Sequence, residues 1–150
     1  MKLTITNNLQ SEIFVPITPK PIFTPVTKPL NEMKIALATA AGIHLKTAER
    51  FNFAGDVSYR EIPGTAKALD LMVSHGGYDN ADANRDLNCM FPIDRLAEIQ
   101  QAGLIKAVAP RHFGFMGGGG DQTAFAESTG PDIAKKLRED AVDAVLLTAG

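Results

Sequence analysis

Cysteine is nearly absent from this 150-residue chain, because Cys89 is the only one. A single thiol makes neither an internal disulfide nor a zinc site, which suits a protein of a reducing compartment. We therefore expect a cytoplasmic protein. Cys89 precedes an expected helix start at Pro92, a position that favours a reactive thiolate, whereas a buried and inert thiol is the commoner alternative.

Long apolar runs and an excess of one charge are also missing. No run approaches the roughly 18 apolar residues of a membrane span, and residues 1–10 lack the apolar stretch of a secretory signal. The formal net charge is −2 and the pI is about 5.9, so the composition carries no sign of nucleic-acid binding. With 45% hydrophobic residues, the chain has the composition of one globular domain with a real core.

Proline is abundant only at the beginning of the chain. Five of the nine prolines fall within residues 1–30, at Pro16, Pro19, Pro21, Pro25 and Pro29. Proline removes backbone donors and disfavours helix or central strand, yet large apolar residues such as Phe14 and Ile22 stand between the prolines. We expect residues 1–30 to form an extended proline-rich arm that lies along the body or a neighbouring subunit.

Residues 31–150 have the pattern of an α/β domain. The expected strands are 33–39, 69–74, 112–116 and 141–147, and residues 45–64 and 75–86 look irregular. One helix begins at Pro92 and ends before Gly103, which suits a left-handed position after the last turn. Asp121 is expected to cap a helix over 123–127, and Pro131 to start another over 132–138. This order predicts a parallel-sheet half of Rossmann-like or flavodoxin-like type.

The last stretch, Ala141 to Gly150, reads as a strand buried on both faces that stops at the start of a turn. In open α/β sheets the edge at the carboxyl ends of the strands is where ligands bind. Thr148 and Gly150 are therefore candidate substrate-binding residues. Since a natural domain rarely ends on such a strand, we expect the chain to be the N-terminal part of a longer subunit, truncated just before its site.

Four consecutive glycines, Gly117, Gly118, Gly119 and Gly120, follow an expected strand and precede a helix. Glycines leave their backbone N–H groups accessible, and the N-terminus of the following helix carries a partial positive charge, so a carboxylate or phosphate is a candidate ligand. Neither nucleotide fingerprint is met, and we expect no nicotinamide site. The alternatives are a flexible turn or a close subunit contact.

Two histidine loops are further candidates. His75 and Asp79 lie in a Gly-, Asn- and Asp-rich segment and could orient or protonate a substrate, although ordinary turn chemistry is the simpler explanation. The Asp spacing there lacks the features of a calcium loop, so we expect no metal. His44 follows a small-residue loop at a strand end and is a candidate substrate contact or a structural histidine.

Long runs of this sequence resemble the selenoprotein family of glycine, sarcosine, betaine and D-proline reductases, and within it the D-proline reductase branch. The resemblance covers essentially the whole chain. The runs that carry it are Phe14–Pro19, Pro25–Leu30, Lys34–Gly42, Val73–Asp79, Cys89–Leu96 and His112–Gly120.

The resemblance implies a function for the segment around Gly150. In that family Thr-Ala-Gly is followed by selenocysteine, whose codon ordinarily means stop, so the nucleophile would come directly after Gly150. A partner subunit carries a pyruvoyl group that activates D-proline, and the ring opens to 5-aminovalerate with electrons from a redox donor protein. By this resemblance the chain is an oxidoreductase subunit of a hetero-oligomer, inactive alone, with no cofactor of its own.

Two other classes of function remain open: an α/β module that binds a small anion without chemistry, and a subunit-interaction protein that docks through its arm. On the enzyme hypothesis, the loops at His44, His75 and Gly117 should surround the point where the chain leaves Gly150, because parallel strands place their following loops at one edge.

Overall fold

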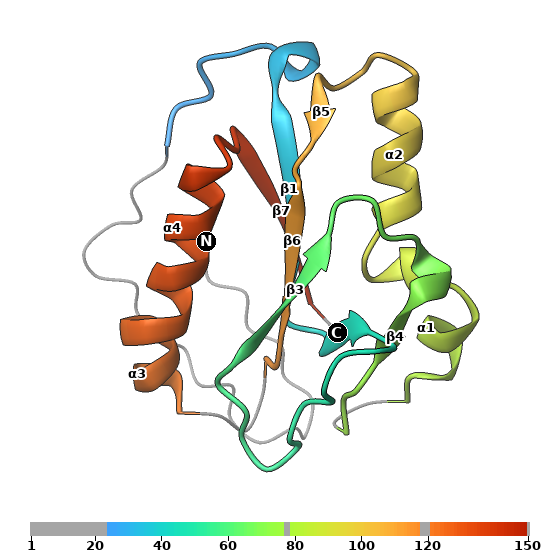
Figure 1. Ribbon diagram of the computed structural model, residues 1–150, viewed down its shortest axis with the longest axis vertical. Coiled ribbons are helices and arrows are strands. Elements are labelled where there is room, and N and C mark those ends of the chain that lie inside the picture. The colour runs from blue at the N-terminus through green and yellow to red at the C-terminus, as the bar shows by residue number, and fades with distance from the viewer. Residues whose placement is uncertain (1–23, 77–78, 118–120, 150) are drawn as a thin grey trace, which may run out of the picture.

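The computed structural model describes residues 24–76, 79–117 and 121–149. It is a mixed α/β structure in which a mostly parallel sheet stands between helices (Figure 1). Helix α4 (Gly130–Glu139) covers one face, and α2 (Ile93–Gln101) lies on the other. The predicted α/β class is confirmed. In the described part of the chain, no helix has the length and apolarity needed to span a membrane.

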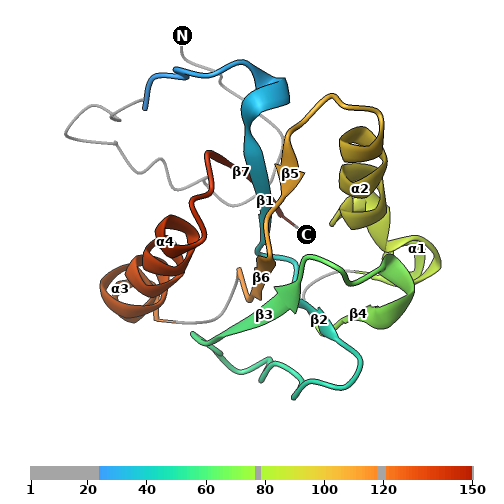
Figure 2. The same ribbon diagram turned by 45° about the horizontal axis from the view of Figure 1, so that its top comes forward.

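Strand β1 (Lys34–Thr39) is the centre of the sheet. It pairs in parallel with β7 (Ala144–Thr148) on one side and with β5 (Ala107–Val108) and β6 (Arg111–Phe115) on the other. From Ile35 to Thr39 every residue of β1 is buried, as expected for a strand covered on both faces. The strands predicted at 33–39 and 112–116 are thus confirmed (Figure 2).

Strand β3 (Tyr59–Pro63) joins the sheet antiparallel to β6, within a region that the sequence pattern predicts to be irregular. That prediction is wrong because β3 has no apolar run, and Ile62 is its only fully buried residue. Turns and polar side chains dominate the rest of residues 46–58.

A bulge separates β5 from β6 and is filled by a histidine. Ile35 of β1 pairs with Val108, and Ala38 pairs with Phe113. The segment from Val108 to Phe113 is therefore longer than the part of β1 that it faces, which is the property of a bulge. The Leu37 N–H there donates to His112 Nδ1 at 3.0 Å. His112 is fully buried, with its ring 6.0 Å from that of Phe91, and burial lowers its pKa to about 4. His112 therefore stays neutral and stabilises the centre of the sheet.

The predicted strand at 69–74 exists as β4 (Leu71–Val73) but lies outside the main sheet. It pairs antiparallel with β2 (Ile43–Leu45), a short strand where a loop was expected. The segment after β4, also expected to be irregular, contains α1 (Ala81–Arg85). Two short 3-10 turns complete this side: Ala68–Asp70 contacts β4, and Leu87–Cys89 contacts α1. A third, Leu30–Glu32, directly precedes β1.

The helix predicted from Pro92 to before Gly103 is confirmed as α2. Gly103 has φ +73°, and the Leu104 N–H bonds to the Ile99 carbonyl at 3.0 Å, which is the six-to-one bond of a Schellman ending.

The two helices predicted after Asp121 are joined into one. Helix α3 (Gln122–Ala124) passes through a π-helical turn (Phe125–Thr129) directly into α4. Pro131 explains the wide turn, because proline has no N–H and its ring crowds the carbonyl four residues earlier in an α-helix. Asp121 caps the start as predicted, accepting from the N–H groups of Thr123 and Ala124.

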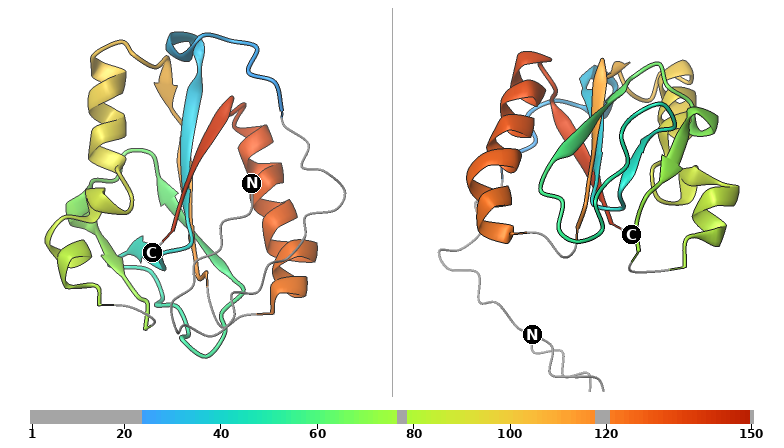
Figure 3. Two further views of the ribbon diagram at one scale, coloured as in Figure 1. Left: turned by 180° about the vertical axis from the view of Figure 1, so that it is seen from behind. Right: turned by 60° about the horizontal axis from the view of Figure 1, so that its bottom comes forward.

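The final strand differs from its prediction. It begins at Ala144, and it is an edge strand of the described sheet rather than one buried on both faces (Figure 3). Leu146 and Leu147 are 48% and 72% exposed. Of the predicted arm, residues 1–23 lie outside the described residues, and Thr24–Leu30 are exposed beside the body, with Lys28 paired to Asp143 at 2.5 Å.

Candidate functional site

The carboxyl ends of β1, β6 and β7 meet at one residue, Ala40. Its N–H donates to the carbonyl of Thr148 at 3.0 Å, and its carbonyl accepts from the N–H of Gly117 at 2.9 Å. Thr148 at the end of β7 and Gly117 at the end of β6 therefore lie on opposite sides of Ala40. The structure brings these two predicted site residues together at the sheet edge where ligands bind in α/β proteins.

Small residues make this approach possible. A Cβ added to Gly117 would lie 2.9 Å from the Ala40 Cβ, closer than two carbons can sit without a shift. Gly42 has φ +68°, and a Cβ there would meet the Ser74 carbonyl at 2.5 Å. The loop after β1 is therefore closely packed between β6 and the start of the His75 segment.

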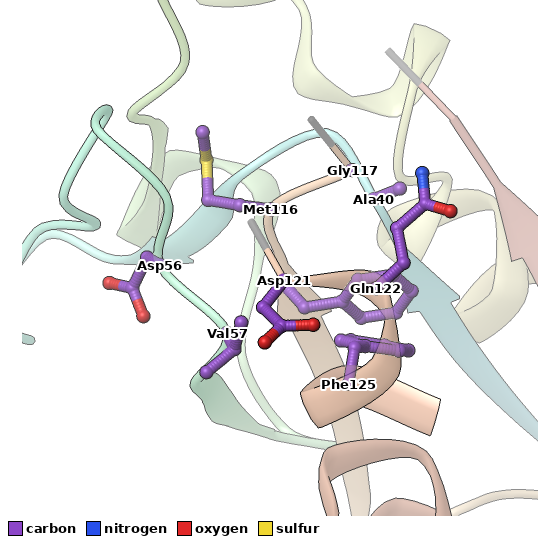
Figure 4. Close-up of a pocket in the computed structure, with 9 residues that line it drawn as sticks. Ala40, Asp56, Val57, Met116, Gly117, Asp121, Gln122 and Phe125 are labelled. Carbon is purple, nitrogen blue, oxygen red and sulfur yellow. The ribbon is translucent and has the colours of Figure 1, made fainter. Parts of the chain in front are cut away.

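A cavity of about 260 Å³ opens beside Ala40 and Gly117 (Figure 4). Its walls come from the end of β6, from the start of the α3–α4 helix and from the loop before β3. Aromatic and aliphatic side chains form most of the lining, and the polar side chains are two carboxylates and one amide. Among the described residues, the lining consists of Ala40, Asp56, Val57, Phe115, Met116, Gly117, Asp121, Gln122 and Phe125.

The π-helical turn shapes the cavity wall. It starts at Phe125, whose ring lies 4.9 Å from that of Phe115 between centroids, tilted by 46°. The Thr129 hydroxyl at the end of the turn donates to the Val57 carbonyl and ties the helix to the opposite wall. The Tyr59 hydroxyl donates to Asp132 nearby. The segment that leads into β3 is thus fastened to the helix at two points.

The two carboxylates at the cavity differ in how they are engaged. Asp56 accepts from the N–H groups of Asn52 and Ser58 and from the Ser58 hydroxyl. Burial raises the pKa of Asp56, but these hydrogen bonds outweigh it and hold the pKa below its ordinary value. Asp121 uses Oδ1 to cap the helix, and its Oδ2 accepts no hydrogen bond from a described residue.

This arrangement alters the argument for an anion site at the glycine loop. The first N–H groups of the helix already bind the Asp121 carboxylate, so they are not free for an external anion. Any anion there would depend on the glycine N–H groups alone. Gly118, Gly119 and Gly120 lie outside the described residues, as does Gly150.

His44 has a supporting position in the structure. It is fully buried, its Nδ1 donates to the Leu45 carbonyl at 2.7 Å, and its Nε2 accepts from the Ser74 hydroxyl at 2.7 Å. Burial lowers its pKa, against a raising effect of the Leu45 bond, and the positive charges of Arg60 and Arg50 lower it further. With both nitrogens engaged inside the protein, His44 holds Ser74, the residue before His75.

His75 and Asp79 lie on either side of residues 77–78, which are outside the described part. His75 is half-buried after β4, and its carbonyl accepts from Asn80 Nδ2 at 3.3 Å. Asp79 is exposed, and its Oδ1 accepts from the Ala81 N–H at the start of α1 at 3.0 Å. The Ser74 N–H bonds to the Gly42 carbonyl, so the His75 segment is anchored to the loop that follows β1.

Thr148 adds an unusual feature at the sheet edge. Its hydroxyl oxygen is buried and has no hydrogen-bond partner among the described residues. Its carbonyl, by contrast, is held by Ala40. Within the described ranges, no three His, Cys, Asp or Glu side chains are placed to hold a metal ion, and Cys89 is exposed.

Sequence reasoning missed the cavity walls. Phe115 and Phe125 flank the glycine loop, which is a signal that could have been used. Asp56 and Val57 gave no signal because they come from a loop of irregular pattern. The π-helical turn that places Phe125 depends on helix continuity through Pro131, which the sequence pattern argues against.

Comparison with known proteins gives one family over the whole chain. The family described as glycine/sarcosine/betaine reductase selenoprotein B matches residues 2–150. No solved structure matches.

Three curated relatives illustrate the range of similarity. The chain is 63% identical over 148 residues to D-proline reductase subunit gamma of Acetoanaerobium sticklandii, covering 99% of this chain and 61% of that protein. It is 31% identical over 156 residues to sarcosine reductase complex component B subunit beta of Peptoclostridium acidaminophilum, covering 97% and 35%. It is 30% identical over 155 residues to glycine reductase complex component B subunit gamma of Carboxydothermus hydrogenoformans, covering 94% and 34%.

Proposed function

Since this chain belongs to the glycine/sarcosine/betaine reductase selenoprotein B family, we propose that it forms the scaffold of a D-proline reductase subunit. The observation that carries the proposal is the 63% identity to D-proline reductase subunit gamma, against 30–31% for a sarcosine and a glycine reductase component. The chain spans 61% of the length of that D-proline reductase subunit. The reductive ring opening of D-proline to 5-aminovalerate would therefore require more than residues 1–150.

The sheet edge around Ala40 is the proposed location of the reaction. Thr148 is fixed to Ala40 through its carbonyl, and Gly117 and the cavity lie on the other side of Ala40. A selenocysteine after Gly150 would supply the nucleophile there, and the pyruvoyl group on a partner subunit would activate the substrate nitrogen.

The residues of this chain would then bind the substrate and donate a proton to it. Of the residues Gly117–Gly120, the last three would donate N–H groups to the substrate carboxylate, because the Gly117 N–H already bonds to the Ala40 carbonyl. His75 would deliver a proton, with Asp79 as its orienting partner. His44 would act indirectly, because its bond to Ser74 positions the residue before His75. Support for the His75 assignment is its partial exposure beside the anchored Gly42–Ser74 contact.

The architecture supports a longer fold. We propose that the complete subunit continues the parallel sheet beyond β7 in a Rossmann-like or flavodoxin-like manner, since Leu146 and Leu147 are exposed on that strand. The subunit would work in the cytoplasm in a hetero-oligomer with the pyruvoyl-containing subunit and a redox donor protein. The proline-rich residues 1–30 would contact one of these chains.

Reconstitution tests the proposal. The complete subunit, carrying selenocysteine or cysteine after Gly150, is combined with the pyruvoyl-containing partner and a dithiol reductant, and 5-aminovalerate is measured. We expect turnover of D-proline by this complex and none when residues 1–150 replace the complete subunit. Turnover by residues 1–150 with the partner, or none by the complete complex, would contradict the proposal.

The role of His75 is tested in the same complex. His75→Ala is expected to lower kcat by about 10²-fold or more, because a positioned proton donor contributes at least that much. Asn80→Ala, which removes the contact to the His75 carbonyl without touching the imidazole, is the comparison variant. Full activity of His75→Ala would remove the proton role from this residue.

A second candidate is a binding or subunit-interaction module without chemistry of its own. The cavity beside Ala40 favours ligand binding in such a module. Ligand binding by the chain together with an inactive complete complex would favour this alternative.

A further inference from the structure

We infer that the cavity between β6 and the α3–α4 helix binds the ammonium group of a small cyclic amine, with Asp121 as its negative partner. The inference rests on the proposed function for the identity of the amine as D-proline. Its preference for a cation over an anion comes from the cavity lining alone. A preference for a cation is the opposite of the sequence-based expectation, in which the glycine loop and the helix start indicate a site for an anion.

The size and lining of the cavity suit a small apolar ring. Its volume is about 260 Å³, just below the range of about 300–1,000 Å³ that is usual for small-molecule sites. The larger apolar side chains in its lining are those of Phe115, Phe125, Met116 and Val57. A saturated five-membered ring is compact enough to lie against the two phenyl groups, and burying it removes apolar area from water.

The charges at the cavity favour a cation. The described lining contains the carboxylates of Asp56 and Asp121 and no Lys, Arg or His. Aromatic rings such as Phe115 and Phe125 also attract cations to their faces. Arg60, the nearest compensating cation to Asp56 at 3.7 Å, has its guanidinium over the Phe51 ring and is not part of the lining.

Asp121 is the carboxylate with unused capacity. Asp56 has both oxygens occupied by Asn52 and Ser58. Asp121 Oδ1 accepts the hydrogen bonds of the helix cap, whereas Oδ2 accepts none from a described residue. Figure 4 shows the Asp121 carboxylate beside Val57 and Phe125. The helix cap thus fixes the carboxylate in place while one oxygen remains for a ligand N–H.

The position of Asp121 also suits an amino acid. Asp121 directly follows Gly117–Gly120 in sequence, and both Gly117 and Asp121 line the cavity. In a cyclic amino acid the carboxylate carbon is only two bonds from the ring nitrogen, so an ammonium group on Asp121 would place both groups of the molecule in the cavity beside Gly117. Asp121 would thereby orient the ring nitrogen relative to the sheet edge at Ala40.

The first test uses two probes of equal ring size and opposite charge. The 150-residue chain is titrated with pyrrolidinium chloride and with sodium cyclopentanecarboxylate, and amide NMR signals of Gly117, Gln122 and Phe125 are followed. We expect pyrrolidinium to bind at least fivefold more tightly, with affinity falling as salt is raised. Equal or tighter binding of cyclopentanecarboxylate overturns the inference, and this comparison needs no variant.

The second test removes the charge and keeps the helix cap. Asp121→Asn retains a capping oxygen, so the melting temperature should change little, yet pyrrolidinium affinity should fall about five- to tenfold. Asp86→Asn is the matched control, because Asp86 also caps a turn through the Asn88 N–H but lies outside the cavity. Wild-type affinity in Asp121→Asn overturns the inference.

The assembled reductase separates this inference from the proposed function. There, Asp121→Asn should raise the KM for D-proline about five- to tenfold with a smaller change in kcat. An unchanged KM in an active complex refutes the role of Asp121 while the proposed function stands. Pyrrolidinium binding to the chain, with no D-proline turnover by the wild-type complex, refutes the proposed function while the cation site stands.

Discussion

The two faces of the sheet differ in how completely they are packed. On the α2 side, a large buried cluster includes Leu37, Ile62 and Phe91, none of which is exposed. On the α4 side, the buried cluster is small and consists of Ala38, Phe113 and Ile133. The cavity adjoins this second side, at the start of the α3–α4 helix.

The difference indicates that the α2 side stabilises the fold, whereas the α4 side is available for ligand binding. The α2 side contains His112 and His44, both fully buried and hydrogen-bonded within the protein. The α4 side combines aromatic cavity walls, an incompletely engaged carboxylate and an exposed Leu147. We therefore expect substitutions on the α2 side to change the free energy of unfolding, and substitutions near the cavity to change binding and catalysis.

The largest effect on stability is expected from Phe91→Ala. Phe91 is fully buried in the α2-side cluster, and truncating a buried Phe costs about 3–5 kcal/mol through lost transfer energy and the cavity left behind. Urea unfolding monitored by circular dichroism measures it. A loss below about 1 kcal/mol would mean that the α2 side is not the stable part of the fold.

The next effect is a pH dependence that belongs to His112. Its pKa is lowered from 6.5 to about 4, so below pH 6.5 the unfolded chain takes up a proton that the folded chain does not. Stability from this residue is complete above pH 6.5 and falls by on the order of 3 kcal/mol as the pH drops to 4.

His112→Asn is the variant that isolates this dependence. Asparagine places an acceptor near the position of Nδ1, so the bond from the Leu37 N–H can be kept while the titrating group is removed. Unfolding free energies at pH 7, 6, 5 and 4 should converge between wild type and variant as the pH falls. Parallel curves would show that His112 does not titrate as its burial requires.

The smallest effect is expected on the α4 side at the edge strand. Leu147 is 72% exposed, and Leu147→Thr keeps a good strand former, so the free energy of unfolding of the 150-residue chain should change by less than about 0.5 kcal/mol. Chemical denaturation of both chains measures the difference. A loss above 2 kcal/mol would show that Leu147 is packed in solution and that the two sides are more alike than the structure indicates.

Sequence reasoning identified the central elements because their signals are local. The apolar run of β1, the Asp121 cap and the glycine after α2 each specify their structure within a few residues. The same reasoning failed at β3 and β2, whose strands depend on partners distant in sequence. It also treated Ala141–Leu147 as buried on both faces, because an apolar composition does not distinguish a central strand from an edge strand.

The candidate site was predictable to a similar degree. The meeting of Gly117 and Thr148 at Ala40 follows from the rule that parallel strands end at one edge. His44 was a candidate for substrate contact, but a strand register that no local pattern encodes buries it against Ser74. The cavity walls depend on a π-helical turn and a distant loop, which only the three-dimensional structure brings together.

The most direct test of the site at Ala40 compares two equal glycine substitutions in the assembled reductase. A Cβ on Gly117 would lie 2.9 Å from the Ala40 Cβ, whereas one on Gly130 would lie 3.4 Å from its nearest neighbour, the Phe125 carbonyl oxygen. We predict that Gly117→Ala lowers kcat/KM for D-proline at least tenfold, because small displacements of reacting groups are costly, while Gly130→Ala stays within about twofold of wild type. Equal kcat/KM values for Gly117→Ala and wild type would contradict the assignment of the reaction to this edge of the sheet.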